Sequence, residues 1–179
     1  MSSALIVIDM QLGSFTPRSA RHDTAGVVSR INLLAEKARA AQGAVIFVQH
    51  DGPPGDPHHP EAPGWHLLPE LEVRQEDRFV RKTACDAFLD SGLDEVLRSA
   101  AIQRLVVTGC ATDYCVDTTV RSALARGYET VVPADGHTTA ERPHLSAGKI
   151  IEHHNAVWSD FISPAGPAQI CPSAEIAFD

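Results

Sequence analysis

The chain has few basic residues, and they form no cluster. Its 179 residues include 15 Lys and Arg against 23 Asp and Glu, which gives a formal net charge of −8. Nucleic-acid phosphates are bound by grouped Lys and Arg side chains, so this deficit argues against a nucleic-acid partner. No apolar run approaches the roughly 20 residues of a membrane-spanning helix, and we therefore expect no membrane partner.

Cysteine is scarce as well, with four residues and no CxxC pair. The apolar run 4–8 is short, follows no basic residues and ends at an acid, which is unlike a secretory signal. We therefore expect reduced thiols in the cytoplasm rather than a disulfide framework. The hydrophobic content of 44% and the absence of an internal repeat suit a single domain, 1–179, with a substantial core.

Short apolar runs alternate with amphipathic stretches along the chain. The runs are rich in β-branched residues and show no polar alternation, as buried parallel strands require. The expected strands are 4–8, 44–49, 78–81, 105–108 and 130–132, with an edge strand at 169–171. This alternation predicts a three-layer, Rossmann-like α/β fold: a parallel sheet of about six strands, helices on both faces and right-handed crossovers.

Helices are predicted between the strands. Helical spacing is shown by Val27, Ile31, Leu34 and Ala38. We expect Gly43 to end this first helix in the left-handed conformation, and Ser91 to cap the next one. A third helix is expected over 114–126, and Pro143 suits the first turn of a last, long helix.

One stretch, 51–71, shows no clear period and is rich in proline and histidine. A loop of this length inside a compact domain is usually functional or disordered. It follows the second strand, so we expect it at the carboxyl end of the sheet, where it would serve as a lid or a pocket wall.

Three polar residues follow strands or open a helix: Asp9 comes after the first strand, Lys82 after the third, and Cys115 opens the helix after the fourth. The carboxyl ends of parallel strands meet at the edge where ligands bind. A carboxylate, an ammonium and a thiol at that edge predict nucleophilic cysteine chemistry. A helix start also favours a thiolate, although a small buried core residue is the alternative for Cys115. Packing roles are expected for Cys85, Cys110 and Cys171.

Three segments carry a family resemblance: LIVIDMQ (5–11), RFVRKTACDAF (78–88) and VVTGCATDYCVDTTVRSALARGY (106–128). They strongly resemble the isochorismatase-like cysteine hydrolases, in the branch related to nicotinamidase, N-carbamoylsarcosine amidohydrolase and streptothricin hydrolase. The resemblance implies a catalytic triad of Asp9, Lys82 and Cys115. It also implies a cis peptide bond between Cys110 and Ala111, which turns the Ala111 and Cys115 N–H groups into an oxyanion hole.

Such a triad has to move a proton from the thiol to the carboxylate. Ordinary pKa values of about 3.9 for Asp and about 8.5 for Cys make this transfer unfavourable by roughly 6 kcal/mol. Burial of Asp9 raises its affinity for the proton, while Lys82 and the helix start favour the thiolate. Because Lys82 also favours a charged Asp9, the sequence does not decide whether the pKa of Asp9 is raised or lowered.

Four further residues are candidates for substrate binding. Gln11 and Phe15 match the family's Asp-x-Gln…Phe pattern, with the Phe one residue later than in the commoner spacing. Trp65 lies in a segment that resembles a family Gly-Trp…Pro-Glu-Leu pattern, with packing as the alternative. His137 follows the fifth strand and approaches the site, unless it joins loops or subunits.

A zinc site is the alternative suggested by a group of imidazoles and a carboxylate, the ligand types that zinc accepts. These residues are His50, Asp51, His58, His59 and His66. The nicotinamidase branch binds its metal through an Asp-x-His element, and here the order is His50-Asp51-Gly52. We therefore expect neither a metal nor another cofactor.

The reaction implied is hydrolysis of a C–N bond in a small amide, carbamoyl compound or lactam through a thioester on Cys115. Isochorismate-type vinyl-ether hydrolysis is the enzymatic alternative, which the thiol disfavours, and a non-catalytic regulatory member is the other. The resemblance also implies a homo-oligomer, a dimer or tetramer. Apolar residues near the carboxyl end suit either a subunit contact or the core: Ile150, Ile151, Val157 and Trp158.

Overall fold

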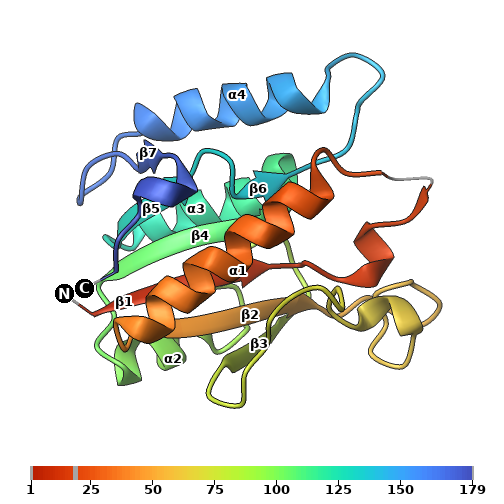
Figure 1. Ribbon diagram of the computed structural model, residues 1–179, viewed down its shortest axis with the longest axis horizontal. Helices are drawn as coiled ribbons and strands as arrows, with labels where there is room; N and C mark the ends of the chain where they lie inside the picture. Colours follow the sequence, from red (N-terminus) through yellow and green to blue (C-terminus); the bar gives the residue numbers. More distant parts are fainter. Residues whose placement is uncertain (1, 18–19, 179) are drawn as a thin grey trace.

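The computed structural model describes residues 2–17 and 20–178. Within these residues, seven parallel strands form one sheet in the order β3-β2-β1-β4-β5-β7, with the short β6 beside β4 (Figure 1). The strands are β1 Ser3–Ile8, β2 Ala44–His50, β3 Arg78–Lys82, β4 Arg104–Cys110, β5 Glu129–Pro133, β6 His137–Thr138 and β7 Gln169–Cys171. The parallel sheet predicted from the sequence is confirmed.

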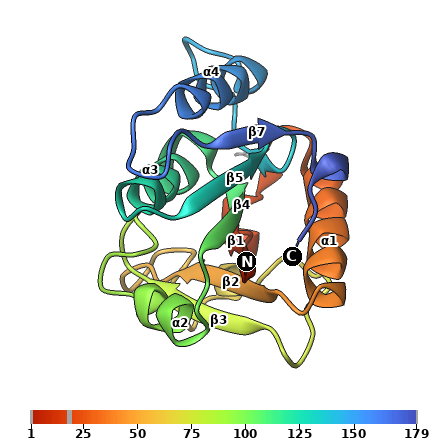
Figure 2. The same ribbon diagram turned by 90° about the vertical axis from the view of Figure 1, so that its left-hand side faces the viewer.

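Helices cover both faces of this sheet. They are α1 Thr24–Ala40, α2 Leu93–Ser99, α3 Asp117–Ala125 and α4 Ala147–Ser159. Figure 2 shows α1 on one side of the strands and α2 and α3 on the other, with α4 beside β7 at the sheet edge. The three layers agree with the predicted Rossmann-like arrangement.

Each face of the sheet has its own apolar core. Ile31 and Leu34 of α1 pack with Phe47 on one face. Leu97 of α2 and Trp158 of α4 belong to the cluster on the other face. All five side chains are at most 1% exposed, and burial of this kind contributes about 1.5–3 kcal/mol for each large apolar side chain. The sheet edge that carries the polar residues is thereby held between two packed layers.

Gly109 brings the ends of β1 and β4 close together. Its φ of +118° lies in the range that favours glycine, and an added Cβ would lie 2.1 Å from the carbonyl oxygen of Ile8, its partner in the sheet. No other residue fits this position without moving a strand. The close approach places Asp9, which follows Ile8, beside the turn that follows β4.

Two helix ends differ from the sequence-based predictions. Gln42, and not Gly43, adopts the left-handed conformation after α1. Gly43 is needed for a different reason, because an added Cβ would lie 3.0 Å from the carbonyl oxygen of Ser3. Similarly, α4 begins at Ala147 with Ser146 as its N-cap. Pro143 lies in a turn closed by hydrogen bonds between the residues on either side of it, a usual site for proline.

The two remaining helix starts also differ. Gly92 occupies the N-cap position of α2, and Ser91 assists by accepting a hydrogen bond from the Leu93 N–H at 3.2 Å. Before α3, residues Thr112–Val116 form a wider, π-helical turn, so Cys115 lies in this turn rather than in the first turn of the α-helix.

The apolar residues near the carboxyl end divide between core and surface. Ile150 is 3% exposed and Trp158 is fully buried, so these two form part of the core. Ile162, in contrast, is 97% exposed. Among the described residues, no helix has the length and apolar character needed to cross a membrane.

Candidate active site

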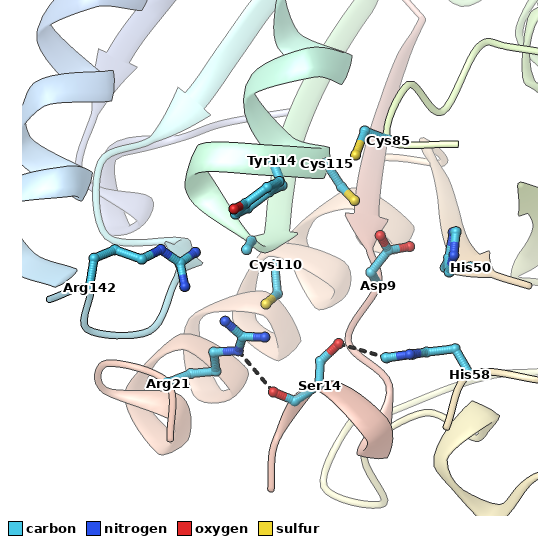
Figure 3. Close-up of a pocket in the computed structure, with 11 residues that line it drawn as sticks. Asp9, Ser14, Arg21, His50, His58, Cys85, Cys110, Tyr114, Cys115 and Arg142 are labelled. Carbon is cyan, nitrogen blue, oxygen red and sulfur yellow. Dashed lines mark hydrogen bonds between the residues drawn. The ribbon is translucent and has the colours of Figure 1, made fainter. Parts of the chain in front are cut away.

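A pocket of about 280 Å³ lies at the carboxyl ends of the strands (Figure 3). This volume lies just below the usual range for small-molecule sites, about 300–1,000 Å³. The lining residues come from the ends of three strands and from four loops. They are Asp9, Ser14, Arg21, His50, His58, Cys85, Cys110, Ala111, Tyr114, Cys115 and Arg142.

Lys82 joins the carboxylate and the thiol. Its ammonium donates hydrogen bonds to Asp9 Oδ2 at 2.7 Å, to Cys115 Sγ at 3.4 Å and to the Ala84 carbonyl at 2.9 Å. All three donors of the ammonium are therefore used. The Lys82 side chain has no exposed surface, so this ion pair is shielded from solvent. The structure thus brings together the three residues that the sequence singled out.

The sheet fixes the carboxylate and the ammonium in this arrangement. Lys82 pairs with His50 across β2 and β3, and the Asp9 N–H donates to the Val48 carbonyl at 2.9 Å. Asp9 itself has a φ of +47°, an uncommon value for a residue with a side chain. Its second carboxylate oxygen, Oδ1, is buried and has no hydrogen-bond partner among the described residues. That oxygen is the one available to accept a proton.

The turn after β4 places Cys115 at the pocket. Its peptide bond between Cys110 and Ala111 is cis. The Ala111 carbonyl accepts hydrogen bonds from the Tyr114 and Val116 N–H groups at 3.0 and 3.1 Å, so this carbonyl is directed into the turn. Ala111 precedes the turn and Cys115 lies in it, and both line the pocket.

Charges in the site set the resting protonation state. Burial lowers the pKa of Lys82, but the Asp9 carboxylate and then the Cys115 sulfur outweigh burial and hold this pKa above its usual value. For Cys115, burial and then the charge of Asp9 raise the thiol pKa far above its usual value, against the opposing effect of Lys82. Burial and the facing carboxylate therefore oppose ionisation of the thiol in this geometry, so the raised pKa is opposite in direction to the depression predicted from the helix start.

Two of the four predicted substrate-binding residues are buried and bond other protein groups instead. Gln11 is fully buried, and its side chain bonds the backbone of His50 and Trp65 at 2.8–3.0 Å. His137 is 1% exposed and bonds Thr112 Oγ1 through Nδ1 and Asn155 Oδ1 through Nε2. Burial above all lowers the pKa of His137 to about 4, so the ring is neutral at pH 7. These residues hold the pocket walls and do not line the pocket.

The other two also lie outside the pocket lining. Phe15 packs against the core beneath α1. Trp65 donates from Nε1 to Asp51 Oδ1 at 2.8 Å, and the Arg81 guanidinium lies over its ring at 5.4 Å. Packing, the alternative considered for Trp65, is therefore what the structure supports.

Several residues that line the pocket were not among the substrate contacts predicted from the sequence. Ser14 Oγ lies 2.9 Å from His58 Nε2, and His58 Nδ1 lies 3.1 Å from Asp56 Oδ1, a chain that ties the loop 51–71 to the segment after β1. The loop is thus a pocket wall, as predicted. Arg21 comes from the same connection between β1 and α1 as Ser14, and Arg142 comes from the loop between β6 and α4. Cys85, predicted to be a packing residue, is exposed and lines the pocket as well.

Two of the residues considered as zinc ligands have other partners. Asp51 bonds Trp65 and, at 2.7 Å, Arg81, while His58 bonds Ser14 and Asp56. In the part of the chain that the structure describes, no three His, Cys, Asp or Glu side chains are grouped so that they could hold a metal ion.

The fold and the pocket together define a class: three-layer α/β proteins with a thiol, a carboxylate and an ammonium at the carboxyl edge of a parallel sheet. Residues 3–158 match the family model described as the isochorismatase domain. The chain therefore belongs to the isochorismatase family of hydrolases.

Individual relatives are hydrolases of small molecules. Streptothricin hydrolase of Streptomyces noursei is 38% identical over 140 residues, which cover 78% of this chain and 56% of that protein. This chain thus spans little more than half of that relative's length. Ureidoacrylate amidohydrolase RutB of Pseudomonas syringae is 32% identical over 170 residues, covering 74% of this chain and 69% of that protein. A crystal structure of an isochorismatase family protein has a TM-score of 0.87 and 30% identity, with 94% and 96% of the two chains covered.

Proposed function

We propose that this protein is a cysteine hydrolase that cleaves a C–N bond of a small amide, carbamoyl compound or lactam through a thioester on Cys115. The observation that carries the proposal is the position of the Lys82 ammonium, which contacts both the Asp9 carboxylate and the Cys115 sulfur at the pocket. The relatives named above, a streptothricin hydrolase and a ureidoacrylate amidohydrolase, support hydrolase activity.

In the first half of the reaction, Cys115 Sγ attacks the carbonyl carbon. The thiol proton passes to Asp9, whose Oδ1 has no partner among the described residues and is available for it. Because burial and the charge of Asp9 raise the pKa of the thiol, proton loss accompanies formation of the C–S bond, and Lys82 stabilises the negative sulfur as it develops. The Ala111 and Cys115 N–H groups then hold the negative oxygen of the tetrahedral intermediate.

Collapse of this intermediate breaks the C–N bond. Asp9 gives its proton to the leaving nitrogen, so an amine or ammonia departs and a thioester remains on Cys115. In the second half, Asp9 takes a proton from a water molecule that attacks the thioester carbonyl. The C–S bond then breaks and Asp9 returns the proton to the departing sulfur, so the products are the free acid and the original thiol.

A substrate screen with matched cysteine variants tests this proposal. Wild-type protein is expected to hydrolyse at least one compound in a set of primary amides, N-carbamoyl compounds and lactams. Cys115→Ser is expected to reduce the turnover of that compound by about 10³-fold or more, because the hydroxyl is a much weaker nucleophile in the same place. Liquid chromatography with mass detection of the released acid measures both rates.

Cys171→Ser is the control, since Cys171 lies in β7 and does not line the pocket. It is expected to keep wild-type turnover. Equal melting temperatures for the two variants would show that the fold survives each change. Undiminished hydrolysis by Cys115→Ser would contradict the proposal.

A further inference from the structure

The cationic side chains at the pocket differ in how their charge is balanced. Lys82 is paired with Asp9, and Arg142 is held by both oxygens of Asp113, the closer pair of atoms at 2.8 Å. Arg21 is the exception. Among residues 2–17 and 20–178, no carboxylate lies within ion-pair distance of its guanidinium. The pocket therefore carries one positive charge that the described residues do not neutralise.

Arg21 is held in a defined position at the pocket. Its backbone pairs with Ala140 in an antiparallel bridge, and its Nε donates to the Ser14 carbonyl at 2.8 Å. These two contacts leave the Nη1 and Nη2 edge of the guanidinium directed toward the pocket, beside Cys110 (Figure 3). The planar pair of N–H groups on that edge matches the two oxygens of a carboxylate.

The neighbouring side chains add no net negative charge at this end of the pocket. Burial raises the pKa of the Cys110 thiol to about 12, so it is neutral at pH 7. The Asp113 carboxylate, which also acts on this thiol, is balanced by Arg142. Arg21 is thus the dominant charge at the far end of the pocket from Asp9, in a chain whose formal net charge is −8.

We propose that Arg21 binds a carboxylate of the substrate, so that the enzyme acts on small amide or carbamoyl compounds that are anionic, in preference to cationic lactams. This inference rests on the proposed function. It assigns the reacting carbonyl to Cys115 and the anionic end of the same small molecule to Arg21. A specificity residue is thereby placed on a loop opposite the catalytic side chains.

Two alkylating agents test the anion site without any turnover. Iodoacetate carries a carboxylate and iodoacetamide is its neutral analogue, and both displace iodide at a thiol. The ratio of the two rate constants at Cys115, measured by peptide mass mapping, reports the preference of the pocket for an anion. We expect Arg21→Gln to lower this ratio about tenfold relative to wild type, because the positive charge that concentrates the anion is lost.

Two variants separate charge from structure. Arg21→Lys keeps the charge but lacks the planar group, and is expected to keep a ratio well above that of Arg21→Gln. Arg98→Gln changes an exposed arginine on α2 and is expected to leave the ratio as in wild type. An unchanged ratio in Arg21→Gln would overturn the anion site.

A substrate pair separates this inference from the proposed function. N-carbamoylglycine and its methyl ester differ in one negative charge, and Arg21→Gln is expected to lower kcat/KM about tenfold for the acid only. If neither compound nor any related amide is hydrolysed but the alkylation ratio depends on Arg21, the proposed reaction is wrong and the anion site stands. If wild type and Arg21→Gln hydrolyse both compounds equally well, the anion site is wrong and the proposed reaction stands.

Discussion

The pocket has two walls of different origin. The strand-end wall consists of Asp9, Cys110, Ala111 and Cys115, with Lys82 directly behind them. The loop wall consists of Ser14, Arg21, His58 and Arg142. Asp9, Lys82, Cys110 and Ala111 are at most 9% exposed, whereas every residue of the loop wall is half-buried. The sheet thus fixes Asp9, Lys82 and Cys110, while the loop wall comes from the connections between elements, where the binding residues of enzymes commonly lie.

Among changes in the strand-end wall, replacement of Lys82 is expected to have the largest effect on stability and turnover. Lys82→Met preserves the length of the side chain but leaves Asp9 buried without its partner, which costs about 3–5 kcal/mol of folding free energy. Turnover is expected to fall about a hundredfold or more, because the developing thiolate loses its counter-charge. Urea unfolding and steady-state kinetics measure the two effects, and Lys149→Met, which changes an exposed ion pair with Glu152, is the control.

The same variant has a pH signature. The pKa of Lys82 in the folded state lies above its unfolded value of about 10.4, so its stabilising effect is present below that pH. This contribution is lost as the pH rises through the folded-state value. The Lys82→Met protein is expected to lack that alkaline loss of stability, and an identical alkaline profile for both proteins would show that the ion pair contributes nothing.

Replacement of the buried His137 tests how much the residues behind the strand-end wall contribute to stability. Its folded-state pKa of about 4 lies below the unfolded value of about 6.5, so its contribution to stability is present above pH 6.5 and is lost as the pH falls toward 4. We expect this residue to account for about 3 kcal/mol of acid destabilisation. His137→Gln should therefore lose less stability between pH 7 and pH 4 than wild type or the exposed control His153→Gln, as measured by urea unfolding.

Replacement of Ser14 tests the loop wall, and its expected effect on activity is the smallest of these predictions. Ser14→Ala removes the hydrogen bond to His58 Nε2, which contributes about 1 kcal/mol or less at a half-buried position. We expect KM to rise a few-fold and kcat to stay unchanged, because the catalytic side chains do not contact Ser14. Ser159→Ala, an exposed change on α4, is the matched control. A large fall in kcat would show that the two walls do not act separately.

The two walls also differ in how far the sequence predicts them. Asp9, Lys82 and Cys115 each follow a strand that the apolar pattern identifies, and parallel strands bring such ends together whatever the loops do. The loop wall depends on contacts between distant residues, such as the bridge from Arg21 to Ala140 and the bond from Ser14 to His58. No local period encodes these contacts, so Arg21 was not predicted as a substrate contact.

Two other differences between the sequence-based predictions and the structure concern Pro143 and the pKa of Cys115. Pro143 suits a helix start and a β-turn equally well, and the pairing of Arg142 with Leu145 decides for the turn. For Cys115, the sequence indicated the stabilising effects of Lys82 and the helix start. Burial and the facing carboxylate, which dominate the thiol pKa, depend on tertiary packing. The protonation state could therefore not be predicted from the order of residues.

The most direct test of the account is the mass of the enzyme during turnover. Wild-type protein is mixed with its best amide substrate, quenched in acid within milliseconds and digested for mass spectrometry. The account predicts an acyl group on the peptide that contains Cys115, its amount rising and then falling as substrate is consumed. An acyl group on any other residue, or steady hydrolysis with no covalent adduct at any time, would contradict it.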